Sequence, residues 1–98
     1  MEQNYKIIVE YDGSNYSGWQ IQKNTKQTIQ QKLEDALTKL NKCRGQVTGA
    51  GRTDAGSHAA GQAANFFLDD EIPVNKIPIA LNTELPADII CKNAEKVE

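Results

Sequence analysis

Apolar and polar positions alternate along residues 5–11, which is the pattern of a strand with one buried face. Lys6, Ile8 and Glu10 lie on one side of that strand. The opposite, more apolar side consists of Tyr5, Ile7, Val9 and Tyr11. The run Asp-Gly-Ser-Asn at positions 12–15 has turn chemistry, so the strand is expected to end there.

Residues 16–27 form a long connection that holds Trp19 and several side-chain amides. After it, apolar residues recur at helical spacing. Thr28 begins a capping box with Gln31, so we predict a helix over about 28–42. Its apolar stripe, which should face a core, consists of Ile29, Leu33, Ala36, Leu37 and Leu40.

The second half of the chain predicts two strands, a shorter helix and a final strand. Strands are expected at residues 46–50 and 62–68, and in the latter Ala64, Phe66 and Leu68 share one face. Pro73 and Asn75 mark the start of the second helix, and the Leu-Pro pair at 85–86 ends it. Residues 88–97 are predicted to form the last strand.

The order strand, helix, strand, strand, helix, strand predicts an α+β fold of the ferredoxin-like β-α-β-β-α-β type. One antiparallel sheet should carry two helices on one face and leave the other open. Ninety-eight residues make one domain, 1–98, and no apolar run approaches the roughly 20 residues that span a membrane. Because the N-terminus is polar, a cytoplasmic location without membrane contact is expected.

Charge is unevenly distributed: residues 1–49 carry a net +2 and residues 50–98 a net −4. Lysines of the first half could contact phosphates, although a solvated helix face is the favoured interpretation of the helical ones. Cys43 and Cys91 lie far apart without a neighbouring ligand, so they predict reduced thiols and no metal site.

The glycine-rich stretch at residues 51–59, Gly-Arg-Thr-Asp-Ala-Gly-Ser-His-Ala, is the strongest candidate for chemistry. Gly51 and Gly56 allow sharp bends and close approach to a ligand. Arg52 can hold Asp54 ionised, and an oriented carboxylate can act as a nucleophile or a base. Alternatively, Asp54 bonds its own backbone, as aspartates in such turns often do. The predicted topology places this stretch between the two middle strands, at a sheet edge that a large ligand can reach.

This stretch resembles the catalytic loop of the TruA-type tRNA pseudouridine synthases, G-R-T-D-A-G-V-H-A, with Ser57 in place of the usual valine. Residues 11–22 are similar to the same family's Y-D-G-x-x-Y-x-G-W-Q-x-Q. The resemblance implies isomerisation of uridine to pseudouridine at positions 38–40 of the tRNA anticodon stem-loop, with Asp54 as the nucleophile. Attack at C6 of the base, attack at C1′ of the sugar and removal of a sugar proton remain open. Because the reaction transfers no electrons, no cofactor or metal is expected.

Four residues are candidates for contact with tRNA. Arg52 would pair with Asp54 and help to splay the RNA, while His58, Gln20 and Lys23 would contact it. For His58, a structural hydrogen bond is the simpler interpretation.

Three residues of the 11–22 segment have alternative interpretations. Tyr16 and Trp19 could stack on bases or pack in the core. Asp12 could cap its turn or orient Arg52.

The similarity covers nearly all of this chain but only about the first half of a typical family member. The chain is therefore expected to be an N-terminal domain that holds the nucleophile but cannot turn over alone. The C-terminal half would supply a tyrosine, a second basic residue and part of a homodimer contact. The main alternative is a non-catalytic ferredoxin-like RNA-binding module. A small hydrolase such as an acylphosphatase is less favoured, because no matching glycine-arginine signature is present.

Overall fold

The computed structural model describes residues 3–41, 47–49, 56, 58–68 and 72–97. Its elements are β1 (Gln3–Tyr11), α1 (Ile29–Asn41), β2 (Val47–Gly49), β3 (Ala59–Leu68), α2 (Ile77–Glu84) and β4 (Ile89–Val97). There are also two short 3-10 helices: η1 (Gly13–Asn15) follows β1, and η2 (Val74–Lys76) precedes α2. This order confirms the predicted β-α-β-β-α-β plan.

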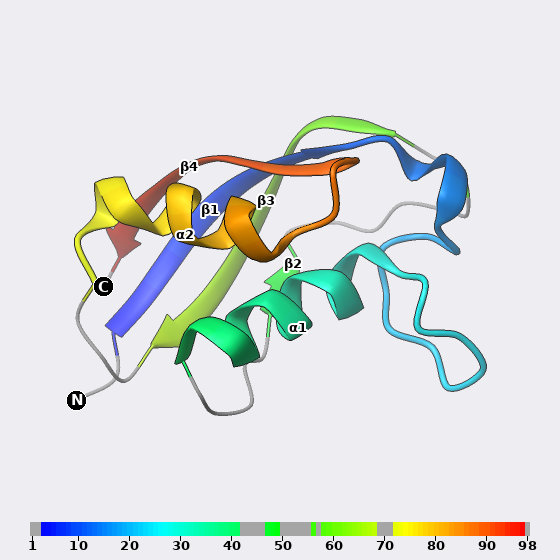
Figure 1. Ribbon diagram of the computed structural model, residues 1–98, viewed down its shortest axis with the longest axis horizontal. Coiled ribbons are helices and arrows are strands. Elements are labelled where there is room, and N and C mark those ends of the chain that lie inside the picture. The colour runs from blue at the N-terminus through cyan, green and yellow to red at the C-terminus, as the bar shows by residue number, and fades with distance from the viewer. Residues whose placement is uncertain (1–2, 42–46, 50–55, 57, 69–71, 98) are drawn as a thin grey trace.

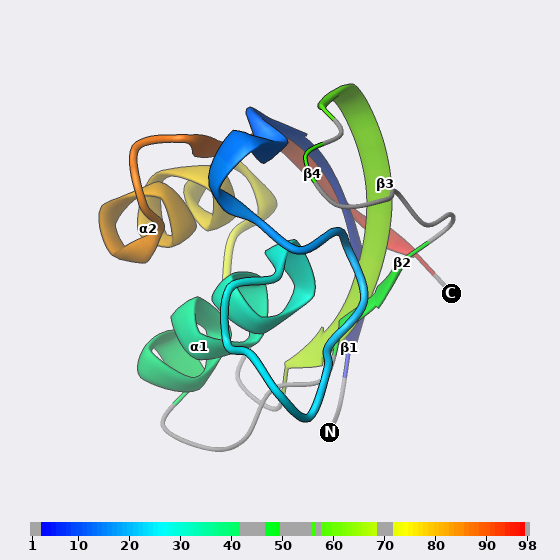
Figure 2. The same ribbon diagram turned by 90° about the vertical axis from the view of Figure 1, so that its right-hand side faces the viewer.

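The four strands form one sheet in the order β2-β3-β1-β4, and every neighbouring pair is antiparallel (Figure 1). Both helices lie on the same face of this sheet, and no described helix covers the other (Figure 2). The ferredoxin-like prediction is therefore confirmed. Tyr11 is paired with both Ala59 and Ile89. The end of β1 and the starts of β3 and β4 thus meet at one place, here called the groove end of the sheet.

The core lies between the sheet and the helices, and the strand alternation predicted it well. The odd positions of β1 from Tyr5 to Tyr11 are buried, as are Ala64, Phe66 and Leu68 in β3. Burying one large apolar side chain of this kind contributes about 1.5–3 kcal/mol. Phe67 points to the uncovered face of the sheet and remains 54% exposed.

The start of α1 follows only half of the predicted capping box. The Gln31 amide donates to Thr28 Oγ1 at 3.2 Å, and Thr28 is fully buried. The Gln31 side chain instead donates to Asp35, one turn further along the helix, at 2.9 Å. An i, i+4 partner on the same face therefore replaces the reciprocal bond to the cap.

The connection before α1 supplies the acceptors that the helix itself lacks at its N-terminus. The amides of Ile29 and Gln30 donate to the carbonyls of Gly18 and Trp19 at 3.2 and 2.9 Å. Gly18 adopts a φ of +94°, which glycine reaches without steric cost. Four amides of an α-helix have no partner inside it, so these bonds fix where α1 begins.

Two element boundaries differ from the predicted ones by three residues or more. β3 begins at Ala59 rather than at Gln62, because β1 continues to Tyr11 and offers a partner to that stretch. The helix expected from Pro73 onward begins with a 3-10 turn and becomes α-helical only at Ile77. Small side chains and long-range backbone pairing give no periodic signal, so the sequence pattern misses both.

Side chains of α1 occupy the outer edge of β2. The Val47 amide donates to Glu34 Oε2 at 3.1 Å, and Gln30 Nε2 donates to the Val47 carbonyl at 2.8 Å. These bonds replace the strand neighbour that an edge strand lacks. In the described parts of the chain, no helix is long and apolar enough to cross a membrane.

Gly49 lies against the ring of Trp19, and this contact leaves no room for a side chain. A Cβ atom added at Gly49 would lie 2.6 Å from Trp19 Cε2, whereas one at Gly61 would meet only Ile8 Cγ2 at 3.6 Å. Trp19 is itself 2% exposed, so its ring cannot move aside into solvent.

We therefore expect Gly49→Ala to lower the free energy of unfolding by about 1–3 kcal/mol through overpacking. Gly61→Ala, the matched control in a neighbouring strand, should leave it within about 0.5 kcal/mol of the parent or raise it. Urea denaturation of both variants measures this difference. Equal stability of the two would contradict the close contact with Trp19.

Candidate functional site

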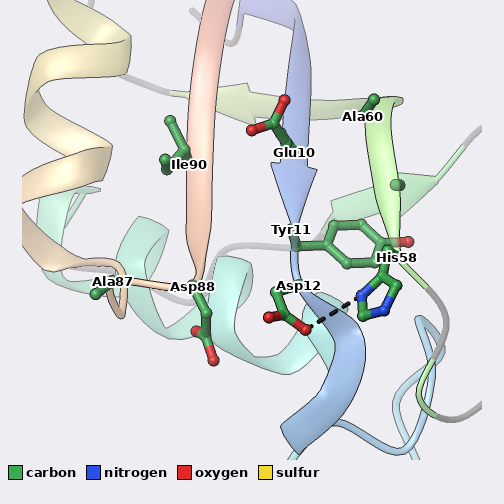
Figure 3. Close-up of a pocket in the computed structure, with 9 residues that line it drawn as sticks. Glu10, Tyr11, Asp12, His58, Ala60, Ala87, Asp88 and Ile90 are labelled. Atoms are coloured by element: carbon green, nitrogen blue, oxygen red, sulfur yellow. Dashed lines mark ion pairs between the residues drawn. The ribbon is translucent and has the colours of Figure 1, made fainter.

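A groove of about 570 Å³ lies at the groove end of the sheet. Three carboxylate residues and the single histidine of the chain line it, together with apolar side chains that include Ile90. The polar members are Glu10, Asp12, His58 and Asp88 (Figure 3). The end of β1, the start of β3 and the residues before β4 each contribute, so the groove depends on the sheet register.

Asp12 caps the η1 turn that follows β1. Its Oδ1 accepts bonds from the Ser14 hydroxyl at 2.6 Å and from the Ser14 amide at 3.0 Å. The Ser14 hydroxyl and then the Ser14 amide lower the pKa of Asp12, with a smaller contribution from His58. The turn-capping role is therefore present. A role in orienting Arg52 stays a prediction, because Arg52 lies outside the described residues.

His58 is fixed by the turn at the end of β1. Its Nδ1 accepts a bond from the Gly13 amide at 3.0 Å and lies 3.1 Å from Asp12 Oδ1. Its side chain is nevertheless 64% exposed and faces the groove (Figure 3). The residue thus makes a structural hydrogen bond and remains accessible to a ligand.

Tyr16 joins the same turn to the start of β4. Its hydroxyl donates to Asp88 Oδ1 at 2.5 Å. Burial, and then this bond to Asp88, raise the pKa of Tyr16 above its ordinary value, so the phenol stays protonated at neutral pH. Tyr16 and Trp19 are both buried, and the Trp19 ring lies 6.3 Å from that of Tyr11. Of the two interpretations for these rings, the structure shows core packing.

The two sequence motifs are joined by backbone groups at the exit of the glycine-rich stretch. The Gly56 amide donates to the Tyr16 carbonyl at 3.1 Å, and Gly56 has a φ of +78°. The bond from the Gly13 amide to His58 is a second link between them. Gly56 and His58, which are distant in sequence from residues 13–16, are therefore bonded directly to that turn.

The structure describes only some of the remaining predicted site residues. Gly51, Arg52 and Asp54 lie outside the described residues, as does Ser57. Gln20 and Lys23 are exposed on the connection before α1 and do not line the groove. Within the described ranges, no group of three or more His, Cys, Asp or Glu side chains could hold a metal ion.

Sequence reasoning assigned no site role to Glu10 or Asp88. Both are ordinary strand or strand-flanking residues in the sequence, and only the pairing of β1 with β4 brings them together. The sequence placed Asp88 at the start of the predicted strand 88–97 but gave no indication that this strand pairs with β1.

Removing the Ser14 hydroxyl should raise the pKa of Asp12 toward its ordinary value. Because folding lowers this pKa, the interaction stabilises the protein above the unfolded-chain value and is lost as the pH falls through the folded value. Ser14→Ala should therefore be less stable than the parent at neutral pH and equally stable in acid. NMR titration of the carboxyl carbons tests this, and the other carboxylates serve as controls. An unmoved Asp12 titration would refute the assignment.

Comparisons with known proteins bear on the same two motifs. Residues 7–98 match the family model described as tRNA pseudouridine synthase. The tRNA pseudouridine synthase A of Ruminiclostridium cellulolyticum is 51% identical over 92 residues, which cover 94% of this chain and 37% of that protein. The one from Caldicellulosiruptor saccharolyticus is 49% identical over 94 residues, covering 96% of this chain and 38% of that protein.

A third relative, tRNA pseudouridine synthase A 1 of Protochlamydia amoebophila, is 49% identical over 94 residues. This match also covers nearly all of this chain and less than two fifths of that protein. The chain thus spans less than two fifths of the length of these relatives, with 37% and 38% of the first two. The family match includes both the turn after β1 and the glycine-rich stretch bound to it. On this evidence the chain belongs to the tRNA pseudouridine synthase family.

Proposed function

We propose that this chain is the N-terminal, nucleophile-bearing part of an enzyme that isomerises uridine to pseudouridine in tRNA. One observation carries the proposal: the glycine-rich stretch is bonded at Gly56 and His58 to the turn formed by the other family motif. Asp54 is only two residues before Gly56 in the chain. The proposed nucleophile is therefore close in sequence to two residues, Gly56 and His58, that are bonded at the groove end of the sheet.

The reaction needs a well-placed carboxylate and no redox partner. The bond between C1′ and N1 of the nucleoside breaks, the uracil turns, and C1′ bonds to C5. The proton on C5 leaves and N1 gains one, so atoms and electrons balance without a redox partner. Asp54 would attack C6 or C1′ or take a sugar proton, and Arg52 would keep it ionised. Gly51 and Gly56 would provide the bends around these two residues.

We propose the uridines at positions 38–40 of the anticodon stem-loop as substrates. A target base must leave its stack before the carboxylate can reach it. Arg52, His58, Gln20 and Lys23 are the proposed RNA contacts. Gln20 and Lys23 are exposed, as such contacts require, and His58 faces the groove.

The complete site is proposed to need more than this chain. The relatives are more than twice as long, since the chain spans 37% and 38% of two of them. A C-terminal half of the same enzyme would supply further groups and, in a homodimer, further contacts. Without them the chain should release no product, because positioning and electrostatic stabilisation provide most of the barrier reduction.

We expect Asp54→Asn in the full-length enzyme to bind tRNA but to lose at least about a thousandfold in rate, as loss of a catalytic nucleophile or base does. Because C5 loses its hydrogen, release of tritium from tRNA labelled at C5 of uridine measures the reaction. Asp35→Asn removes an exposed carboxylate on α1 and is the matched control, with parental activity.

Two results would count against this proposal. Undiminished tritium release by Asp54→Asn would exclude Asp54 as the nucleophile. Tight tRNA binding without tritium release by the unmodified full-length protein would favour the non-catalytic RNA-binding module.

A further inference from the structure

The two ring nitrogens of His58 have different surroundings. Nδ1 lies 3.0 Å from the Gly13 amide nitrogen and 3.1 Å from Asp12 Oδ1. Nε2 has no hydrogen-bond partner among the described residues, and it lies on the side of the ring away from Asp12 (Figure 3). One nitrogen is therefore held by the protein while the other is available to a ligand.

The partner of Nδ1 decides which nitrogen carries the proton. A backbone amide can only donate, so the bond from Gly13 requires the lone pair of Nδ1 and places the proton of the neutral ring on Nε2. The Asp12 carboxylate, 3.1 Å from the same nitrogen, can only accept and would favour the opposite tautomer. In the charged ring both nitrogens carry protons, and Nε2 is again a donor. The tautomer is thus assigned from the hydrogen-bond network.

The opposite tautomer would require Nδ1 to donate to Asp12, and two observations disfavour it. Asp12 Oδ1 already accepts two bonds from Ser14, at 2.6 and 3.0 Å. Gly13 is buried, and His58 is the acceptor that the structure gives its amide. Turning Nδ1 into a donor would therefore leave a buried amide without its partner while adding a third donor to Asp12.

The carboxylates that line the groove together with His58 also have other partners. Glu10 lies 3.7 Å from Lys92 Nζ in an ion pair, and Asp88 accepts the Tyr16 hydroxyl. With Asp12 bonded to Ser14, each carboxylate that lines the groove has a partner of its own. His58 Nε2 is then a donor that the described protein leaves unused.

We infer that His58 is a fixed hydrogen-bond donor and not a general base: the Gly13 amide holds Nδ1, and Nε2–H is presented to an acceptor oxygen of the bound RNA. The inference rests on the proposed function for the identity of the ligand, but the tautomer does not depend on it. His58 acts as a binding residue through Nε2, and its Nδ1 positions the stretch that follows Asp54.

The tautomer can be measured on this chain without RNA. Long-range nitrogen–proton NMR correlations of the single histidine, recorded at a pH where the ring is neutral, should show a protonated Nε2 and an unprotonated Nδ1. A protonated Nδ1, or rapid exchange between equal amounts of both forms, would overturn the inference.

Two substitutions of His58 distinguish the role of Nδ1 from that of Nε2. The Asn side chain places an oxygen near the position of Nδ1, so His58→Asn should keep the Gly13 bond and the stability but lose the donor. The Gln side chain places its amide nitrogen near Nε2, so His58→Gln should keep the donor and lose stability. In the full-length enzyme, His58→Asn should bind anticodon stem-loop RNA about five- to tenfold more weakly, the effect of one lost hydrogen bond. His58→Gln should bind more tightly than His58→Ala.

Substituted RNAs identify the acceptor oxygen. If the loss caused by His58→Asn disappears with a methylphosphonate linkage, the acceptor is a phosphate oxygen, and if it disappears with a 2′-deoxy sugar, it is a ribose hydroxyl. RNA binding by His58→Asn equal to that of the parent would overturn the contact. Failure of the parent enzyme to bind tRNA would overturn the proposed function together with the contact, whereas the NMR result would still decide the tautomer.

Discussion

The backbone carbonyls of Tyr16, Gly18 and Trp19 accept hydrogen bonds from three different amides, those of Gly56, Ile29 and Gln30. The side chains of the same segment, residues 16–19, reach two further elements. The Tyr16 hydroxyl bonds to Asp88 before β4, and the Trp19 ring lies on Gly49 at the end of β2. A short segment without regular structure thereby connects the helix start, two strands and the glycine-rich stretch. Displacing it would break bonds in each of these places at once.

Described residues on both sides of positions 50–55 contact residues 13–19. Gly49, at the end of β2, lies directly against Trp19, and Gly56 and His58, near the start of β3, bond to Tyr16 and Gly13. For the proposed nucleophile Asp54 such contacts would matter, because a small misplacement of a reacting group can cost about a hundredfold in rate. In the proposed function, the hydrophobic core under the sheet therefore contributes to catalysis by holding in place the residues that contact Gly49, Gly56 and His58.

Much of the fold was predictable because its signals are local. The alternation in β1 and the helical spacing in α1 identified buried faces that the structure confirms, among them those of Ile7, Leu33 and Phe66. The contacts that build the groove were not predictable in the same way. The bonds from Tyr16 to Asp88 and from Gly13 to His58 join residues 72 and 45 positions apart, and they exist only because of the strand register. Asp54 was identified from the resemblance to a family, and its role remains a proposal.

The amides of Gly56 and Gly13 bind the two motifs to each other in the folded chain. Hydrogen exchange of these two amides, measured by NMR on this chain, tests both links, because exchange requires that the hydrogen bond opens. We expect both amides to exchange much more slowly than they would in an unstructured peptide. Exchange of both at the unstructured rate, in a chain whose strand amides are protected, would contradict both links.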